Sequence, residues 1–297
     1  MKLNIWLILD GKRGHEKQIE DLAFSINKKI NSNITKIKKI SFLNTFLNFL
    51  KIGNDPCKYF PRPDLIIAAG HQTHFDALQK KIRYGGKIIL IMKPSIPSFL
   101  FDLIIIPLHD NIFWKKNTLS IDGTVNKIMN KNKQEKNSGL ILLGGPSKNY
   151  LWSNEKVIDQ INNILNDNPK LKFTIATSRR TPVELKNDTK FVHENLLIVS
   201  HESAPHDWLE NNIGNYQYSW VTQDSISMLY ELIASGSIVN LIRLESKNRK
   251  FEKLFFELER QGKINNQYSA QSFDRFSKNN QSSAEYCAEF IIKNLVN

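Results

Sequence analysis

The chain has 297 residues, of which 41% are hydrophobic and 24% charged, as in a folded protein with room for two domains. No apolar run reaches the roughly 20 residues of a membrane-spanning helix, and the amino terminus lacks the cleavage site of a signal peptide. Two cysteines, Cys57 and Cys287, argue against a disulfide framework or a cysteine-based metal site. These features predict a cytoplasmic protein.

The net charge of +12 is unevenly distributed. Residues 1–137 hold 23 Lys and Arg against 11 Asp and Glu, whereas residues 138–297 hold 18 of each kind. The basic half could face an anionic partner such as the inner surface of the membrane, where the protein would be peripheral. An AT-rich genome, which favours Lys, Asn and Ile, explains the same excess equally well. Nucleic acid is not an expected partner, because no arginine-rich helix or basic and aromatic stripe occurs.

Apolar runs alternate with amphipathic stretches along the chain, a pattern that predicts parallel βαβ units. In the first half we expect strands at 3–9, 34–40, 64–69, 87–92 and 102–106, with helices at 16–29 and 75–83. In the second half we expect strands at 139–143, 172–176, 196–200, 219–222 and 238–242, with helices at 154–166, 204–212, 225–235, 249–261 and 284–295.

A polar, Lys- and Asn-rich stretch at 126–137 separates the two series, and the charge changes there too. We therefore predict an α/β fold of two Rossmann-like domains, whose parallel sheets face a cleft with their strand carboxyl ends. The predicted N-terminal domain covers 1–125, the linker 126–137 and the C-terminal domain 138–280. The last helix, within 281–297, could pack back on the N-terminal domain.

Two polar loops in the first half follow predicted strands, where ligands bind in parallel α/β sheets. Asp10-Gly-Lys-Arg-Gly-His15 opens the first helix, so His15 could take a proton from an acceptor hydroxyl. Gly70-His-Gln-Thr-His74 follows the third strand and could contact the acceptor. The alternative is that Asp10 and His15 only organise a turn and that Thr73 caps a helix. No metal site is expected, because the histidines of this loop lack nearby carboxylates.

A histidine and an aspartate also follow the fifth predicted strand, as His109 and Asp110. The pair could sit at the floor of the cleft, because it lies at the carboxyl end of a strand. A structural histidine with satisfied hydrogen bonds explains the same pattern.

Four segments follow predicted strands of the second half and carry groups that bind phosphate or sugar. They are residues 144–148, 177–181, 201–203 and 222–231. The Gly144-Gly145 pair offers N–H groups to a diphosphate, but P-loop spacing is absent, so ATP hydrolysis is not expected. The arginines at 179–180 suit phosphate recognition. Side chains at 222–225 could cap a helix in which Glu231 holds ribose hydroxyls. Together these loops indicate a nucleotide site.

These loops resemble those of the mitochondrial fission "elongated mitochondria" family, which contains plant proteins and bacterial relatives regarded as glycosyltransferases. The resemblance spans nearly the whole chain and rests on segments 9–18, 63–74, 101–110, 143–146, 177–182 and 221–231. The specific elements are Thr-Ser-Arg-Arg-Thr-Pro and Val-Thr-Gln-Asp-Ser-Ile-Ser-Met. More remotely, the arrangement is similar to GT-B glycosyltransferases, including the lipid-linked N-acetylglucosaminyltransferase of peptidoglycan synthesis. Pro146 departs from those enzymes, in which Ser or Thr with more glycine often follows the glycine pair.

The resemblance implies a metal-independent glycosyltransferase that moves a sugar from a nucleotide-sugar to a cell-envelope or lipid-linked acceptor and needs no cofactor. The catalytic residues would be His15 and Asp10. The donor-binding residues would be Gly144, Gly145, Ser147, Lys148, Ser178, Arg179, Arg180, Thr181, Thr222, Asp224, Ser225, Ser227, Met228 and Glu231. The acceptor-binding residues would be Gly14, Gln18, Gly70, Gln72, Thr73, His74, His109 and Asp110.

Two alternatives remain open. The first is a non-catalytic adaptor that recruits partners to a membrane, as the plant relatives are thought to do. The presence of His15, Arg180 and Glu231 argues against complete loss of an active site, although a shared fold does not prove shared chemistry. The second is a nucleotide-sugar epimerase, which needs acid and base groups on both faces of the sugar. His109, His201 and Glu202 would permit it.

Overall fold

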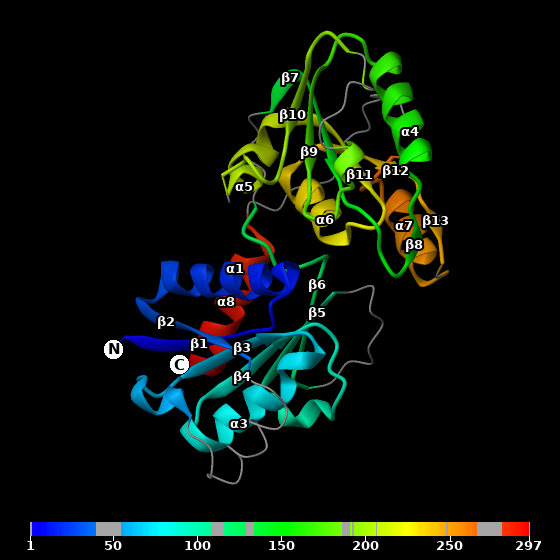
Figure 1. Ribbon diagram of the computed structural model, residues 1–297. Helices are drawn as coiled ribbons and strands as arrows, with labels where there is room; N and C mark the ends of the chain where they lie inside the picture. Colours follow the sequence, from blue (N-terminus) through cyan, green and yellow to red (C-terminus); the bar gives the residue numbers. More distant parts are fainter. Residues whose placement is uncertain are drawn as a thin grey trace. The chain divides into compact units, whose positions relative to one another are not determined.

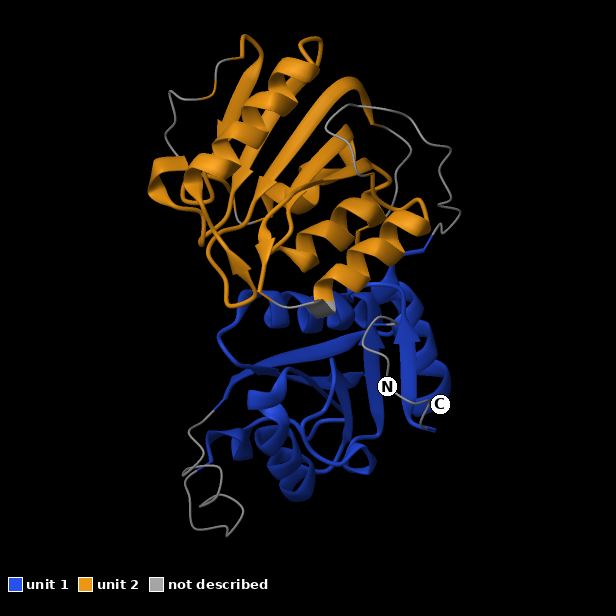
Figure 2. Cartoon of the chain, turned by 90° about the vertical axis from the view of Figure 1, so that its right-hand side faces the viewer, with its two compact units in different colours: residues 1–127, 281–297 blue, residues 128–280 orange. Residues whose placement is uncertain are grey.

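The computed structural model describes residues 2–39, 55–107, 116–128, 134–185, 191, 193–205, 207–247, 249–265 and 281–296. The chain forms two compact units, which Figure 2 shows in different colours. Unit 1 consists of residues 1–127 and 281–297, and unit 2 of residues 128–280. The last segment of the chain therefore belongs to the same unit as the first.

The described part of unit 1 contains a parallel sheet of six strands in the order β2-β1-β3-β4-β5-β6 (Figure 1). The strands are β1 (Leu3–Leu9), β2 (Ser32–Lys38), β3 (Leu65–Ala69), β4 (Lys87–Ile91), β5 (Leu103–Pro107) and β6 (Thr118–Ile121). The helices are α1 (Arg13–Lys29), α3 (His74–Tyr84) and α8 (Ser283–Ile291). Short 3-10 turns cover Pro56–Tyr59, His71–Thr73 and Ser98–Leu100.

Helices cover both faces of this sheet, which explains why its central strands are continuous apolar runs. On β1, Ile5 and Leu7 face the layer that contains α1 and α8, whereas Trp6 faces the layer that contains α3. Alternate residues of a strand point to opposite faces, so one short sequence supplies both cores.

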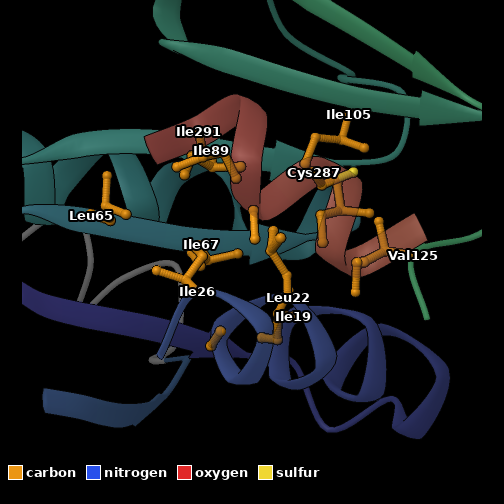
Figure 3. Packing of buried hydrophobic residues seen from close by; sticks show 14 of the residues in the cluster. Ile19, Leu22, Ile26, Leu65, Ile67, Ile89, Ile105, Val125, Cys287 and Ile291 are labelled. Atoms are coloured by element: carbon orange, nitrogen blue, oxygen red, sulfur yellow. The ribbon is translucent and has the colours of Figure 1, made fainter. Parts of the chain in front are cut away.

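Helix α8 completes the first of these cores. Figure 3 shows Cys287 and Ile291 of α8 among residues of α1 and of the sheet strands, and both side chains are fully buried. Ser282 caps the helix by accepting a hydrogen bond from the Glu285 N–H at 3.2 Å. Ser283 ties the helix to the end of the first segment, because its hydroxyl donates to the Thr124 carbonyl at 2.8 Å. Residues 281–296 are thus part of the core of unit 1.

A buried ion pair lies on the other face of the sheet. The Lys80 Nζ is 2.7 Å from the Asp55 Oδ2, and neither side chain is more than 2% exposed. Burial alone would raise the pKa of the Asp55 carboxyl, but the Lys80 hydrogen bond and the Cys57 N–H outweigh it and lower that pKa to about 2. The carboxylate therefore stays charged and needs its partner.

We expect Lys80→Met to reduce the free energy of unfolding by about 3 kcal/mol, because the buried Asp55 carboxylate loses its hydrogen-bonded cation and keeps only the Arg83 Nη1 at 4.0 Å. Urea denaturation measures the loss. Lys36→Met is the matched control, since Lys36 is 56% exposed in its ion pair with Glu20 and should cost less than about 1 kcal/mol. Equal losses of unfolding free energy in the two variants would contradict the claim that the buried Asp55 carboxylate depends on Lys80.

The described part of unit 2 contains a parallel sheet in the order β10-β9-β7-β11-β12 and a short antiparallel pair, β13-β8. The strands are β7 (Glu135–Leu143), β8 (Tyr150–Leu151), β9 (Lys172–Thr177), β10 (Leu196–Val199), β11 (Tyr216–Thr222), β12 (Ile238–Ile242) and β13 (Glu245–Ser246). The helices are α4 (Asn154–Asp167), α5 (Trp208–Asn212), α6 (Ile226–Ser235) and α7 (Arg249–Arg260). Helix α4 covers one face of the sheet, and α6 and α7 cover the other.

The predicted α/β class with parallel sheets is confirmed, and some details differ from the expectation. Strand β6 was not predicted, and strand β7 begins at Glu135, inside the stretch that we expected to be linker. Helix α5 begins at Trp208 instead of Ala204, because a turn from Ser200 to Ala204 and then Pro205 precede it. Among the described residues, no helix is both long and apolar enough to cross a bilayer.

Candidate functional site

The strand order of each sheet marks one edge as the place for a ligand. In unit 1 the chain runs from β1 outward to β2 and then resumes at β3 on the other side of β1. In unit 2 the same reversal occurs at β7, which lies between β9 and β11. Loops leaving neighbouring strands in opposite directions open a crevice at the carboxyl ends of those strands. The loops after β1 and β3, and after β7 and β11, are the loops that the sequence indicated.

In unit 1 the crevice holds a histidine that is fixed by a carboxylate. His15 lies in the first turn of α1, and its Nδ1 is 2.8 Å from the Oδ2 of Asp10, the residue after β1. The Asp10 Oδ1 accepts a hydrogen bond from the Lys12 N–H at 3.0 Å, so the carboxylate itself is held in place. A carboxylate on Nδ1 selects the tautomer in which Nε2 can accept a proton. This is the arrangement of a positioned general base.

The backbone of Gly70, directly after β3, lies against the His15 ring. A Cβ added to Gly70 would come within 2.5 Å of the Nδ1 and Cε1 atoms of that ring. Gly70 also has φ +78°, a conformation that glycine adopts without strain. The two loops of the crevice therefore fit together only because this position has no side chain.

We expect Gly70→Ala to cost about 2–4 kcal/mol of unfolding free energy and to displace the His15 ring from Asp10, because strain and overlap add. Gly11→Ala is the matched control: Gly11 has φ +82°, yet an added Cβ meets nothing within 4 Å. The control should cost only about 1 kcal/mol. Urea denaturation and NMR spectra of the imidazole measure both effects, and an unmoved His15 resonance in Gly70→Ala would contradict the fit.

The loop after β3 turns its last two predicted acceptor residues inward. Thr73 is fully buried, and its hydroxyl donates to the Gly70 carbonyl at 2.8 Å. His74 is fully buried too, with its Nδ1 3.1 Å from the Ser95 hydroxyl oxygen. The expectation that these two side chains contact an acceptor is corrected by their burial, because Thr73 bonds within its own loop and His74 bonds to Ser95 in the loop after β4. Gln72 is exposed at the same turn and accepts a hydrogen bond from Lys39.

Burial, and secondarily the nearby charge of His71, lowers the pKa of His74 from 6.5 to about 4. Between pH 6.5 and pH 4 the unfolded chain therefore binds a proton that the folded protein does not. The free energy of unfolding keeps its full value above pH 6.5 and decreases as the pH falls through this interval. We expect the wild-type protein to lose about 2–3 kcal/mol more than His74→Leu over this interval in urea denaturation. If the free energies of unfolding of the two proteins fell in parallel with pH, the lowered pKa of His74 would be contradicted.

The other residues predicted on the acceptor side divide into two groups. Gly14 and Gln18 lie in the first turns of α1, where the Gln18 Nε2 donates to the Gly14 carbonyl at 3.1 Å. His109 and Asp110 lie outside the described residues.

In unit 2 an arginine joins three loops. Arg180, in the loop after β9, donates from Nη1 to the carbonyls of Gly145 and Pro146, in the loop after β7. Its Nη2 lies 2.7 Å from the Asp224 Oδ2 and 3.3 Å from the Ser225 hydroxyl oxygen, in the loop after β11. The predicted phosphate-binding loops are thus brought together, with a guanidinium at their centre.

The glycine pair is packed tightly beneath this arginine. The Gly144 N–H donates to the Thr222 hydroxyl at 2.8 Å, and the Gly145 N–H donates to the Asp224 Oδ2 at 3.1 Å. A Cβ on Gly145 would lie 1.9 Å from the Arg180 carbonyl oxygen. The expectation that both amides are exposed for a diphosphate is therefore wrong for this conformation, because both already have acceptors within the chain.

Two hydroxyl residues of the β9 loop also serve the chain itself. The Thr181 hydroxyl donates to the Gly144 carbonyl at 2.7 Å, and the Ser178 hydroxyl donates to the same oxygen at 3.0 Å. The expected helix cap is corrected as well. Ser225 is the N-cap residue of α6 but makes no side-chain capping bond, because its hydroxyl instead donates to Asp224.

The remaining predicted donor residues lie around this cluster. Arg179 and Lys148 are exposed, and Ser227 and Met228 are half-buried in the first turn of α6. Glu231 is buried in the second turn of the same helix. The Ser147 hydroxyl is buried without a hydrogen bond in the described part of the chain. No group of three His, Cys, Asp or Glu side chains among the described residues could hold a metal ion.

Residues 13–295 match the family described as Mitochondrial fission ELM1. The chain belongs to this family. Its relatives include "Uncharacterized protein RP120" from Rickettsia prowazekii (strain Madrid E), which is 26% identical over an alignment of 316 residues covering 86% of this chain and 87% of that protein. The resemblance that the sequence motifs indicated is therefore confirmed.

Solved structures share the fold of this ELM1 family member. UDP-GlcNAc 2-epimerase from Neisseria meningitidis, bound to UDP-GlcNAc, has a TM-score of 0.52 at 12% identity, over 99% of this chain and 100% of that chain. MurG from Acinetobacter baumannii has a TM-score of 0.52 at 10% identity, over 99% and 90%. At such low identity the likeness shows the fold alone, which is the α/β fold with Rossmann-like domains that the sequence predicted.

Proposed function

We propose that this protein is a glycosyltransferase that moves a sugar from a nucleotide-sugar to a cell-envelope or lipid-linked acceptor without a metal ion. The observation that carries the proposal is the cluster around Arg180, in which three loops meet at the strand reversal of unit 2. A guanidinium, a glycine pair and the start of a helix are groups that bind phosphate. Buried Glu231 in that helix is suited to the vicinal hydroxyls of a ribose.

In this proposal unit 2 binds the donor, and its cationic groups stabilise the departing diphosphate. Arg179 and Arg180 would stabilise the negative charge that develops as the glycosidic bond breaks. The enzyme would then not need a divalent cation to neutralise that charge. The family resemblance and the shared fold with MurG and with an epimerase bound to UDP-GlcNAc support a nucleotide-sugar as the ligand.

His15 would act as the base for the acceptor hydroxyl if the anomeric centre inverts. Its Nδ1 is held by Asp10, which leaves Nε2 to take the proton as the hydroxyl oxygen attacks the anomeric carbon. The excess of Lys and Arg in residues 1–137 supports an anionic, lipid-linked acceptor and a peripheral place at the membrane.

We expect one class of nucleoside diphosphate or nucleotide-sugar to raise the melting temperature of the purified protein by about 5–10 °C without metal. A ligand at a hundredfold excess over its dissociation constant stabilises the folded state by about 2.7 kcal/mol. Glu231→Gln and Arg179→Ala should reduce the shift. Glu257→Gln and Arg260→Ala, on exposed positions of α7, are the matched controls and should retain it.

The absence of a shift with every nucleotide would overturn the proposal and favour the membrane adaptor. A shift accompanied by conversion of the free nucleotide-sugar, without an acceptor, would favour the epimerase. That reaction could use His201 and Glu202 after β10, where the His201 Nε2 is 3.9 Å from the Glu202 Oε1.

A further inference from the structure

The carboxylate of Asp224 occupies a position built for an anion. Its Oδ2 lies 3.1 Å from the Gly145 N, 2.7 Å from the Arg180 Nη2 and 3.1 Å from the Ser225 Oγ, so three donors from three loops meet on one oxygen. A main-chain N–H, a guanidinium and a hydroxyl are the groups that hold a phosphate oxygen in proteins. The side chain of Asp224 is fully buried, whereas that of Arg180 is 45% exposed. A ligand could therefore reach the arginine.

The carboxylate is only half satisfied in this position. Its other oxygen, Oδ1, is buried without a hydrogen bond in the described part of the chain. A buried carboxylate oxygen that lacks a donor raises the free energy of the conformation that holds it. The observed position of Asp224 therefore has a cost that another position could remove.

Gly144 packs closely against Asp224 on one side of the site, since a Cβ on Gly144 would lie 2.2 Å from the Asp224 Oδ2 and 2.3 Å from the Ser225 Oγ. The Gly145 N–H, the Ser225 hydroxyl and the Arg180 Nη2 all meet at the position of Oδ2. A phosphate oxygen that binds all three donors must therefore take the place of Oδ2. If the Asp224 carboxylate stayed in place, it would also repel the negatively charged phosphate strongly.

We propose that Asp224 is an internal anion that fills the phosphate position of unit 2, and that the diphosphate of a nucleotide displaces it from Arg180, Gly145 and Ser225. This inference rests on the proposed function, because that function supplies the diphosphate. Asp224 then sets the affinity for donor and product, since each binding event must first displace the carboxylate.

The experiment compares the dissociation constants of inorganic pyrophosphate and of ADP, GDP, CDP and UDP for wild-type protein and for Asp224→Asn. The amide keeps the shape of the side chain but removes the competing charge, so we expect binding to tighten by about tenfold or more. Asp159→Asn is the matched control for the change in charge, because Asp159 is exposed on α4, and it should leave the affinity unchanged.

A second measurement uses the wild-type protein and does not depend on the folding of a variant. During titration with pyrophosphate, the amide resonance of Gly145 should shift in proportion to occupancy, because its acceptor changes from carboxylate to phosphate. An unmoved Gly145 resonance at saturation would overturn the inference.

The outcomes separate the inference from the function on which it rests. Nucleotide binding that weakens or stays equal in folded Asp224→Asn means that Asp224 positions Arg180 for the ligand, and it overturns the inference while the proposed function stands. Binding by Asp224→Asn alone supports the inference directly. If neither protein binds any of these anions, both the inference and the nucleotide site are wrong.

Discussion

The ion pair between Arg180 and Asp224 is the interaction on which the candidate site of unit 2 depends. It connects the loops after β9 and β11, and the same two side chains also bond to Gly145 in the loop after β7. A guanidinium can do this because it offers several N–H groups in one plane. The geometry of the glycine pair therefore follows from a side chain that lies 35 residues further along the chain.

In unit 1 fewer groups hold the loops of the candidate site in place. A carboxylate directly after β1 holds His15 through one ring nitrogen, and a glycine directly after β3 lets the ring pack closely against the backbone. In both units a glycine, through its positive φ or its missing Cβ, lets two chain segments approach each other. A larger residue at the same position would keep these segments apart.

The sequence predicted most of the fold, because buried parallel strands are continuous apolar runs that differ clearly from amphipathic helices. Strand β6 was missed, since Thr118–Ile121 is a short edge strand with alternating exposure, and β8 and β13 have two residues each. The loops of the site were predicted from their positions after strands. Their internal bonds were not, because a sequence does not tell whether Asp224 caps a helix or pairs with an arginine.

Some residues that were predicted to bind a ligand form hydrogen bonds within the chain instead. Thr73, His74 and Thr181 are polar residues at strand ends, as ligand-binding residues are, but each is buried and bonds to the chain itself. Thr73 bonds within its own loop, whereas His74 and Thr181 bond to neighbouring loops. A loop that is held rigid needs such internal hydrogen bonds, and buried polar groups are rarely left without partners. Polar composition at a sheet edge therefore identifies the place of a site before it identifies the residues that touch a ligand.

The return of α8 to unit 1 has a consequence for biosynthesis. Ala284, Cys287 and Ile291 complete the core of residues 1–127, yet they emerge from the ribosome only after the whole of 128–280. At about 5–20 residues per second, that segment takes roughly 8–30 seconds to make. During this time the sheet of unit 1 lacks one of its covering helices, and unit 2 has its full sequence before unit 1 does. The unit that begins the chain is thus the last to be completed.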